Sequence, residues 1–167
     1  TSFTRILVVL ALLRQAMGTA QLPPSQVMLG LALFMTLLIM GPTLQGIHAD
    51  ALTPYLNNEI SQETALERAM AHLRTFMYRQ IESAENHEDV YLFLEYQRGR
   101  PIPLDETVTL DDVGSTVLIP AFVLSELKVA FVMGFRIYLP FLVIDMVIAS
   151  ILISMGAMPR SSHPTSP

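Results

Sequence analysis

The chain has 167 residues, of which 51% are hydrophobic and 15% are charged, against about 25% charged residues in an average soluble domain. The apolar content excludes disorder, the lack of cysteine excludes a disulfide framework, and the net charge of −5 provides no basic surface for nucleic acid. A membrane protein, or a subunit buried in a large apolar assembly, remains.

The fold class predicted from the sequence is all-α, that of an integral membrane protein with a helical middle segment. Residues 1–49 are predicted to form N-terminal apolar helices. The first apolar run, 6–13, lies between two arginines and is too short to span a bilayer core, which takes roughly 20 helical residues. The second run, 27–47, has about the length that a span requires. Because proline cannot donate a backbone hydrogen bond, we expect this helix to break at Pro42, near its end.

Residues 50–116 are predicted to form an acidic, helical segment outside the cytoplasm. Thirteen of the 15 acidic residues lie between positions 50 and 112, but only five of the 10 basic ones. Cytoplasmic loops favour Lys and Arg, so this balance favours the extracytoplasmic side.

Two helices are expected within this middle segment. Ser61 is predicted to cap the first one, in which apolar residues recur every three or four positions at Leu66, Met70, Leu73, Met77 and Ile81. The second is predicted over 86–97 and should stop at Gly99. Residues 99–115 contain proline, glycine and acidic pairs, which indicate a loop.

Residues 117–158 are predicted to form a C-terminal apolar helical hairpin. Its two arms are the apolar runs 117–135 and 137–158, with a kink expected at Pro140. The last residues, 159–167, are rich in serine and proline and are expected to be disordered.

No pattern in the sequence supports catalysis or a cofactor. There is no glycine-rich phosphate loop and no cysteine nucleophile. The four histidines are too far apart for any two to share a helical face, so no helix-borne metal pair is expected. An acidic cluster in the loop is interpreted as solvated surface rather than a cation site; its members are Asp105, Glu106, Asp111 and Asp112. An enzyme is therefore the least supported class.

Charged residues inside the apolar runs are the most informative polar positions. A charge in the middle of a bilayer costs at least about 2.5 kcal/mol, so Glu126, Lys128 and Asp145 each require compensation. Glu126 and Lys128 are two residues apart and face different directions on a helix, so we expect their partners on other helices or other subunits. Packing charges are the main interpretation. A proton or ion relay, and helices that never contact lipid, remain alternatives.

Small residues in the same runs predict close helix packing. Ala130 and Gly134 form one pair at four-residue spacing, and Ser150 and Ser154 form another. Such pairs let helix backbones approach each other closely. Together with the charges, they favour packing in an oligomer over an isolated hairpin.

Three separated blocks of sequence carry a family resemblance. The first comprises LRQAMGT at 13–19, PPSQV at 23–27 and GLALF at 30–34. The second is LIPAFVLSELKVAFVMGF at 118–135, and the third is PFLVIDMVIAS at 140–150. In this order they resemble the FliP family of flagellar biosynthetic proteins. The related injectisome export family shares the second block, so an injectisome homologue is an alternative.

The resemblance implies a pore-forming core subunit of the flagellar type III export gate, in the bacterial inner membrane at the flagellar basal body. Several copies would assemble with the partner proteins FliQ and FliR and pass unfolded flagellar subunits. Glu126, Lys128 and Asp145 would then face neighbouring helices rather than lipid. Methionines can fill irregular gaps in any apolar core, but the resemblance places Met155 and Met158 at a ring of methionines that closes the pore.

The end of the sequence departs from the family pattern. Members of the family continue past the methionines into a further apolar helix, whereas a Ser/Pro tail follows Met158 here. We therefore expect a truncated chain, and a non-functional remnant that still inserts in the membrane is one alternative. An alternative of a different class is a small ion-coupled transporter that uses Asp145 and Glu126 as relay carboxylates.

Overall fold

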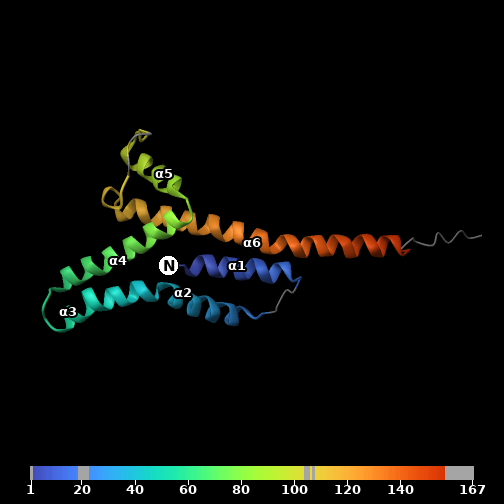
Figure 1. Ribbon diagram of the computed structural model, residues 1–167, viewed down its shortest axis with the longest axis horizontal. Coiled ribbons are helices and arrows are strands. Elements are labelled where there is room, and N and C mark those ends of the chain that lie inside the picture. Colours follow the sequence, from blue (N-terminus) through green and yellow to red (C-terminus); the bar gives the residue numbers. More distant parts are fainter. Residues whose placement is uncertain (1, 19–22, 104–105, 107, 157–167) are drawn as a thin grey trace, which may run out of the picture.

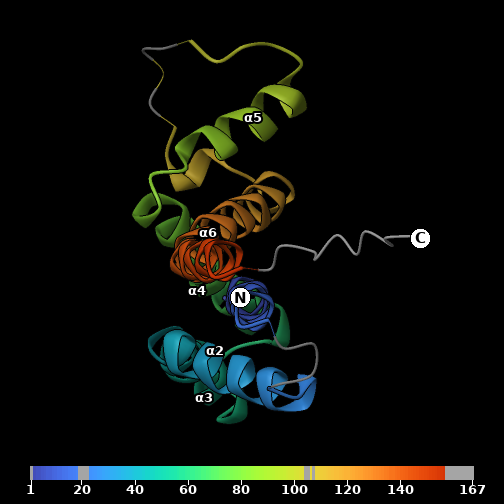
Figure 2. The same ribbon diagram turned by 90° about the vertical axis from the view of Figure 1, so that its right-hand side faces the viewer.

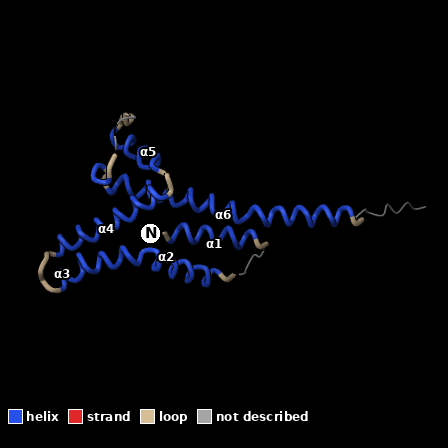
Figure 3. The backbone as a smooth tube through the Cα atoms, viewed as in Figure 1, coloured by secondary structure: helices blue, strands red, loops and turns tan. Residues whose placement is uncertain are grey.

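A computed structural model of the chain describes residues 2–18, 23–103, 106 and 108–156. These residues form helices joined by turns and loops, with no strand among them (Figures 1 and 3). The all-α fold predicted from the sequence is thereby confirmed. In chain order the elements are α1 (Phe3–Ala16), α2 (Ser25–Ile47), the π-helical turn η1 (His48–Leu52), α3 (Thr53–Leu56), α4 (Gln62–Ser83), α5 (His87–Arg98), the 3-10 turn η2 (Leu110–Asp112) and α6 (Ser115–Ser154).

Two helical stretches are long and apolar enough to cross a membrane. Among the described residues they are Ser25–Leu56, which contains an 18-residue segment with a mean hydropathy of 2.1, and Ser115–Ser154, which contains one with a mean hydropathy of 2.3. At 1.5 Å per residue α6 extends about 60 Å, roughly twice the thickness of a bilayer core. The first helix, α1, has only 14 residues and does not reach the length of a span.

The prolines do not interrupt these helices, which corrects two expectations. The helix continues through Pro42 and on through η1 and α3, so it also crosses the segment boundary expected at 49/50. The hairpin expected over 117–158 is not formed, because α6 runs unbroken through Pro120 and Pro140 to Ser154. Proline costs a helix one hydrogen bond, but an apolar helix tolerates it where neighbouring groups and small adjustments satisfy the freed carbonyl.

The helices are arranged around α1 and the first half of α6. Helix α1 lies between α2 and α6 in both views, and it contacts both (Figures 1 and 2). Helices α4 and α5 pack against the N-terminal half of α6, and α4 returns to contact α2 and η1. The C-terminal end of α6 extends away from the other helices (Figure 1).

The hydrophobic core lies where α4, α5 and the beginning of α6 meet. Its aromatic contact joins Phe76 and Phe122, whose ring centroids are 6.2 Å apart in an edge-to-face arrangement. The other fully enclosed side chains around it include Ile81, Leu94 and Leu118. This core fixes the middle segment against one end of α6.

The caps predicted for the middle segment are formed. The Ser61 hydroxyl accepts a hydrogen bond of 3.2 Å from the backbone N–H of Thr64, so the serine caps α4. Gly99 ends α5 in the left-handed conformation, with φ at 66°. The apolar stripe of α4 is buried at its C-terminal end but not at its start, where Leu66 is 64% exposed because no described element covers it.

Candidate functional site along helix α6

The small residues in the first half of α6 lie at its contact with other helices. Ala130 is fully buried. At Gly134, a Cβ atom would lie 2.1 Å from Cδ1 of Leu12 on α1, far closer than van der Waals contact. Gly134 therefore allows the two helices to approach each other.

Ser150 and Ser154 are in a different environment. Both are exposed, and their hydroxyls donate hydrogen bonds of 2.9 Å to the backbone carbonyls of Val147 and Ile151 in the same helix. The structure thus brings Ala130 and Gly134, but not the two serines, into a helix contact within the described chain.

Glu126 is paired with the N-terminal helix. Its Oε1 atom lies 3.3 Å from Nη1 of Arg5, and its side chain is 4% exposed. The other guanidinium nitrogen of Arg5, Nη2, donates to Oγ of Ser2 and to Oε1 of Gln80 on α4, at 3.4 Å each. Arg5 therefore joins α1, α4 and α6 at one point.

Lys128 is paired with α5. Its Nζ atom contacts Oδ1 of Asp89, a residue in the first turn of that helix which is 2% exposed. Beside this pair, the Asn86 amide donates a 2.8 Å hydrogen bond to the hydroxyl of Ser125. The charges on α6 that are two residues apart thus reach two different helices, and the pairing fixes how both lie on α6.

Each buried carboxylate has one oxygen without a partner. Oδ2 of Asp89 and Oε2 of Glu126 accept no hydrogen bond within the described part of the chain. A buried carboxylate that is only half satisfied depends strongly on its remaining cation.

The second half of α6 has little cover from the described residues: Ile137, Tyr138 and Phe141 are half-buried, and every described residue after Phe141 is exposed. After Gly134 no described residue of the chain is buried. Asp145 is exposed and makes no ion pair with any described residue, and Arg136 is exposed as well. Met155 is 79% exposed at the end of the helix. Met158 lies outside the described residues.

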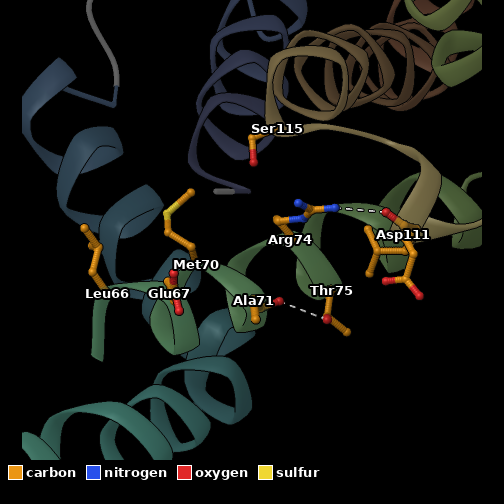
Figure 4. Close-up of a pocket in the computed structure, with 9 residues that line it drawn as sticks. Leu66, Glu67, Met70, Ala71, Arg74, Thr75, Asp111 and Ser115 are labelled. Carbon is orange, nitrogen blue, oxygen red and sulfur yellow. Dashed lines mark hydrogen bonds between the residues drawn. The ribbon is translucent and has the colours of Figure 1, made fainter. Parts of the chain in front are cut away.

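A surface hollow of about 650 Å³ lies between α4, η2 and the start of α6 (Figure 4). Leu66, Glu67 and Met70 are among its lining residues, together with Arg74. Arg74 donates to the backbone carbonyls of Leu110 and Val113, at 2.9 and 2.8 Å, so its guanidinium holds the loop. The contacts of Arg74 are structural, because they fix the loop to α4.

Two other side chains anchor the same loop. The Tyr78 hydroxyl donates to the carbonyl of Val108 at 3.3 Å, and partial burial is the main reason why the pKa of this phenol is raised. Asp112 accepts hydrogen bonds from the hydroxyl and the N–H of Thr109, at 2.7 and 2.9 Å, and these bonds lower the pKa of the carboxyl group.

Sequence reasoning missed the partners of the α6 charges. In the sequence, Arg5 only flanks the first apolar run, and Asp89 is one of the thirteen acidic residues of the middle segment. One signal for Asp89 was present. It adjoins Val90 and precedes Phe93 by four residues, so helical spacing places it beside the apolar face of α5.

Comparison with known proteins supplies a family match and close relatives. The family model described as "FliP family" matches residues 1–164. Three relatives carry the name flagellar biosynthetic protein FliP. The one from Bacillus subtilis is 44% identical over 158 residues, the one from Aquifex aeolicus 46% over 156, and the one from Pectobacterium carotovorum 45% over 158. These alignments cover 93–95% of this chain but 67%, 62% and 58% of the respective relatives.

Proposed function

Because the chain belongs to the FliP family, we propose that it is a pore-forming core subunit of the flagellar type III protein export gate. The observation that carries the proposal is the second half of α6. It is apolar, its described residues after Phe141 are all exposed, and it carries Asp145 with no charge partner among the described residues. An exposed apolar helix with an unpaired charge requires contacts with other helices, subunits or lipid. Membership of the FliP family makes other subunits of an export gate the proposed source of these contacts.

The neighbours we propose are other copies of this chain together with FliQ and FliR. Exposed apolar side chains also cover most of α2, where Phe34, Leu37 and Leu38 are each more than 60% exposed. Only one stripe of α2, at four-residue spacing, is buried within the chain. Both apolar arms therefore have area available for subunits or lipid. The proposed cargo is unfolded flagellar subunits.

The gate itself is proposed to include Met155 and Met158. Met155 directly follows the last residue of α6, and its side chain is exposed. Flexible methionine side chains can close around chains of varied shape, which suits a pore that passes many sequences.

The proposed location is the bacterial inner membrane at the flagellar basal body. Apolar segments at 1–49 and 117–158 would pack in or above the membrane, and residues 117–154 of the second segment belong to the single helix α6. The acidic segment 50–116 would lie outside the cytoplasm, because its charge balance is the one that cytoplasmic loops avoid.

Complementation with co-purification tests the proposal. The chain is expressed with an affinity tag in a strain that lacks its own copy of the gene, and motility and export are measured. We expect restored export and a defined oligomer that contains FliQ and FliR. A chain that accumulates in the membrane but restores neither export nor the oligomer is a remnant, and the proposal fails.

A change at Asp145 separates the gate from an ion-coupled transporter. For an assembly charge, Asp145→Asn should reduce the amount of oligomer recovered. For a relay carboxylate, it should leave the oligomer intact and abolish coupled transport. The exposed charge on the same helix supplies the control, since Arg136→Gln changes charge without touching the carboxylate.

A further inference from the structure

The helix that begins at Ser25 changes its winding near its end. Residues His48–Leu52 form a π-helical turn between α2 and α3. Such turns hold one residue more than an α-helical turn and are frequent at functional sites. Converting this turn to α-helix would shift everything after it by about one residue, or roughly 100° around the helix axis. The turn is thus a natural hinge.

Asp50, at the centre of the turn, is held by two side chains of α4. Nη1 of Arg68 donates a 3.1 Å hydrogen bond to the Asp50 carbonyl, and Nε2 of His72 lies 2.9 Å from the Asp50 carboxylate. Arg68 and His72 are four residues apart, so they project from the same face of α4. Both the backbone and the side chain of the same hinge residue are therefore bound.

Gly46 makes room for this contact. A Cβ atom at this position would lie 2.7 Å from Cε1 and 2.8 Å from Nδ1 of His72, so the imidazole fills the space that a larger residue would need. The other glycines within α2 differ, since a Cβ at Gly30 or Gly41 would meet nothing within 4 Å. Gly46 and Asp50 are one turn apart, which matches the spacing of Arg68 and His72 on the facing helix.

We propose that Gly46, Asp50, Arg68 and His72 form a clip that locks the π-helical hinge. The clip sets the angle between the first apolar arm and α4, and its release lets the two move relative to each other. It is a conformational device of the chain itself, and it does not depend on the proposed role in export.

Spin labels on α2 and α4 report whether the clip is closed. The chain has no cysteine, so cysteines introduced at Leu38 and Leu66, each 64% exposed, give a unique label pair in the full chain in detergent micelles. Double electron–electron resonance should give one narrow distance distribution. Gly46→Ala should broaden it because the new methyl group displaces the imidazole, and His72→Ala should broaden it by a similar amount. The matched control, Gly41→Ala, should leave it unchanged.

The double variant Gly46→Ala/His72→Ala tests whether Gly46 and His72 act through the same contact. If they do, Gly46→Ala adds nothing in a His72→Ala background, and the double variant is as broad as either single one. Broadening that sums the two single effects overturns the clip, as does a narrow distribution in either single variant. If Gly46→Ala alone does not fold, the double variant must fold, since the smaller side chain restores the space. A double variant that also fails to fold overturns the proposal.

Discussion

Replacing Lys128 by methionine removes the cation from a carboxylate that water barely reaches. Asp89 is 2% exposed, and its Oδ2 atom has no hydrogen-bond partner within the described part of the chain. Methionine retains an unbranched stem, so the change is chiefly one of charge. The variant therefore measures how much the stability of the fold depends on the ion pair between α5 and α6.

The expected loss of stability follows from the difference in exposure between Asp89 and Lys128. Removing one partner of a buried ion pair destabilises a protein by about 3–5 kcal/mol. Because the Lys128 side chain is 47% exposed, water already screens its charge, and we expect the lower end, about 3 kcal/mol. Replacing both residues, Asp89→Leu with Lys128→Met, should recover most of this loss, since apolar pairs often replace buried ion pairs at little cost.

Denaturant unfolding of the purified chain in detergent, followed by circular dichroism, measures these changes. Arg136→Met is the matched control, because Arg136 is an exposed cation of the same helix. It should change the free energy of unfolding by no more than about 0.5 kcal/mol. The reasoning is refuted if Lys128→Met is as mild as this control, or if the double variant is no more stable than the single one.

Three further predictions concern helix packing, capping and pH. Gly134→Ala should destabilise the chain by about 1–3 kcal/mol by overpacking against Leu12, and Leu12→Ala in the same chain should relieve part of that cost, as thermal unfolding would show. Ser61→Ala should cost about 1 kcal/mol and fray the start of α4, seen as faster amide hydrogen exchange there. The pKa of Asp112 is lower in the folded chain than in the unfolded one, so the stability it contributes is present above the unfolded pKa and is lost as pH falls through the folded one. An NMR titration should show a pH-dependent change in the Thr109 amide signal as the Asp112 carboxyl group is protonated, and Asp112→Asn should remove that change.

Local signals in the sequence were sufficient for the ends of the middle helices. Ser61 and Gly99 act through contacts within a few residues, so their roles follow from their immediate neighbours. The prolines were misleading for a related reason. Pro42 and Pro140 carry a local cost, but the long apolar helices around them outweigh it, and that balance depends on the whole helix.

The partners of the charges could not be found from spacing alone. The positions of Glu126 and Lys128 showed that each needed a partner on another element, but Arg5 is 121 residues away from Glu126 and Asp89 is 39 away from Lys128. Which element meets which face of α6 is decided by the core packing of α4 and α5 and by the close approach at Gly134. Those contacts arise only in the folded chain.

The two carboxylates of α6 distinguish the half of the helix that packs within the chain from the half that is exposed. Glu126 lies in the half of the helix that α1, α4 and α5 surround, and it is paired within the chain. Asp145 lies on the same helix five turns further on, by helix geometry of about 3.6 residues per turn, and no described element reaches it. A chain that compensates one charge so closely and leaves the other exposed in an apolar surface is organised as an anchor at one end and a contact surface at the other. That division is what the proposed gate requires, because the anchored half holds each copy rigid while the exposed half remains available to its neighbours.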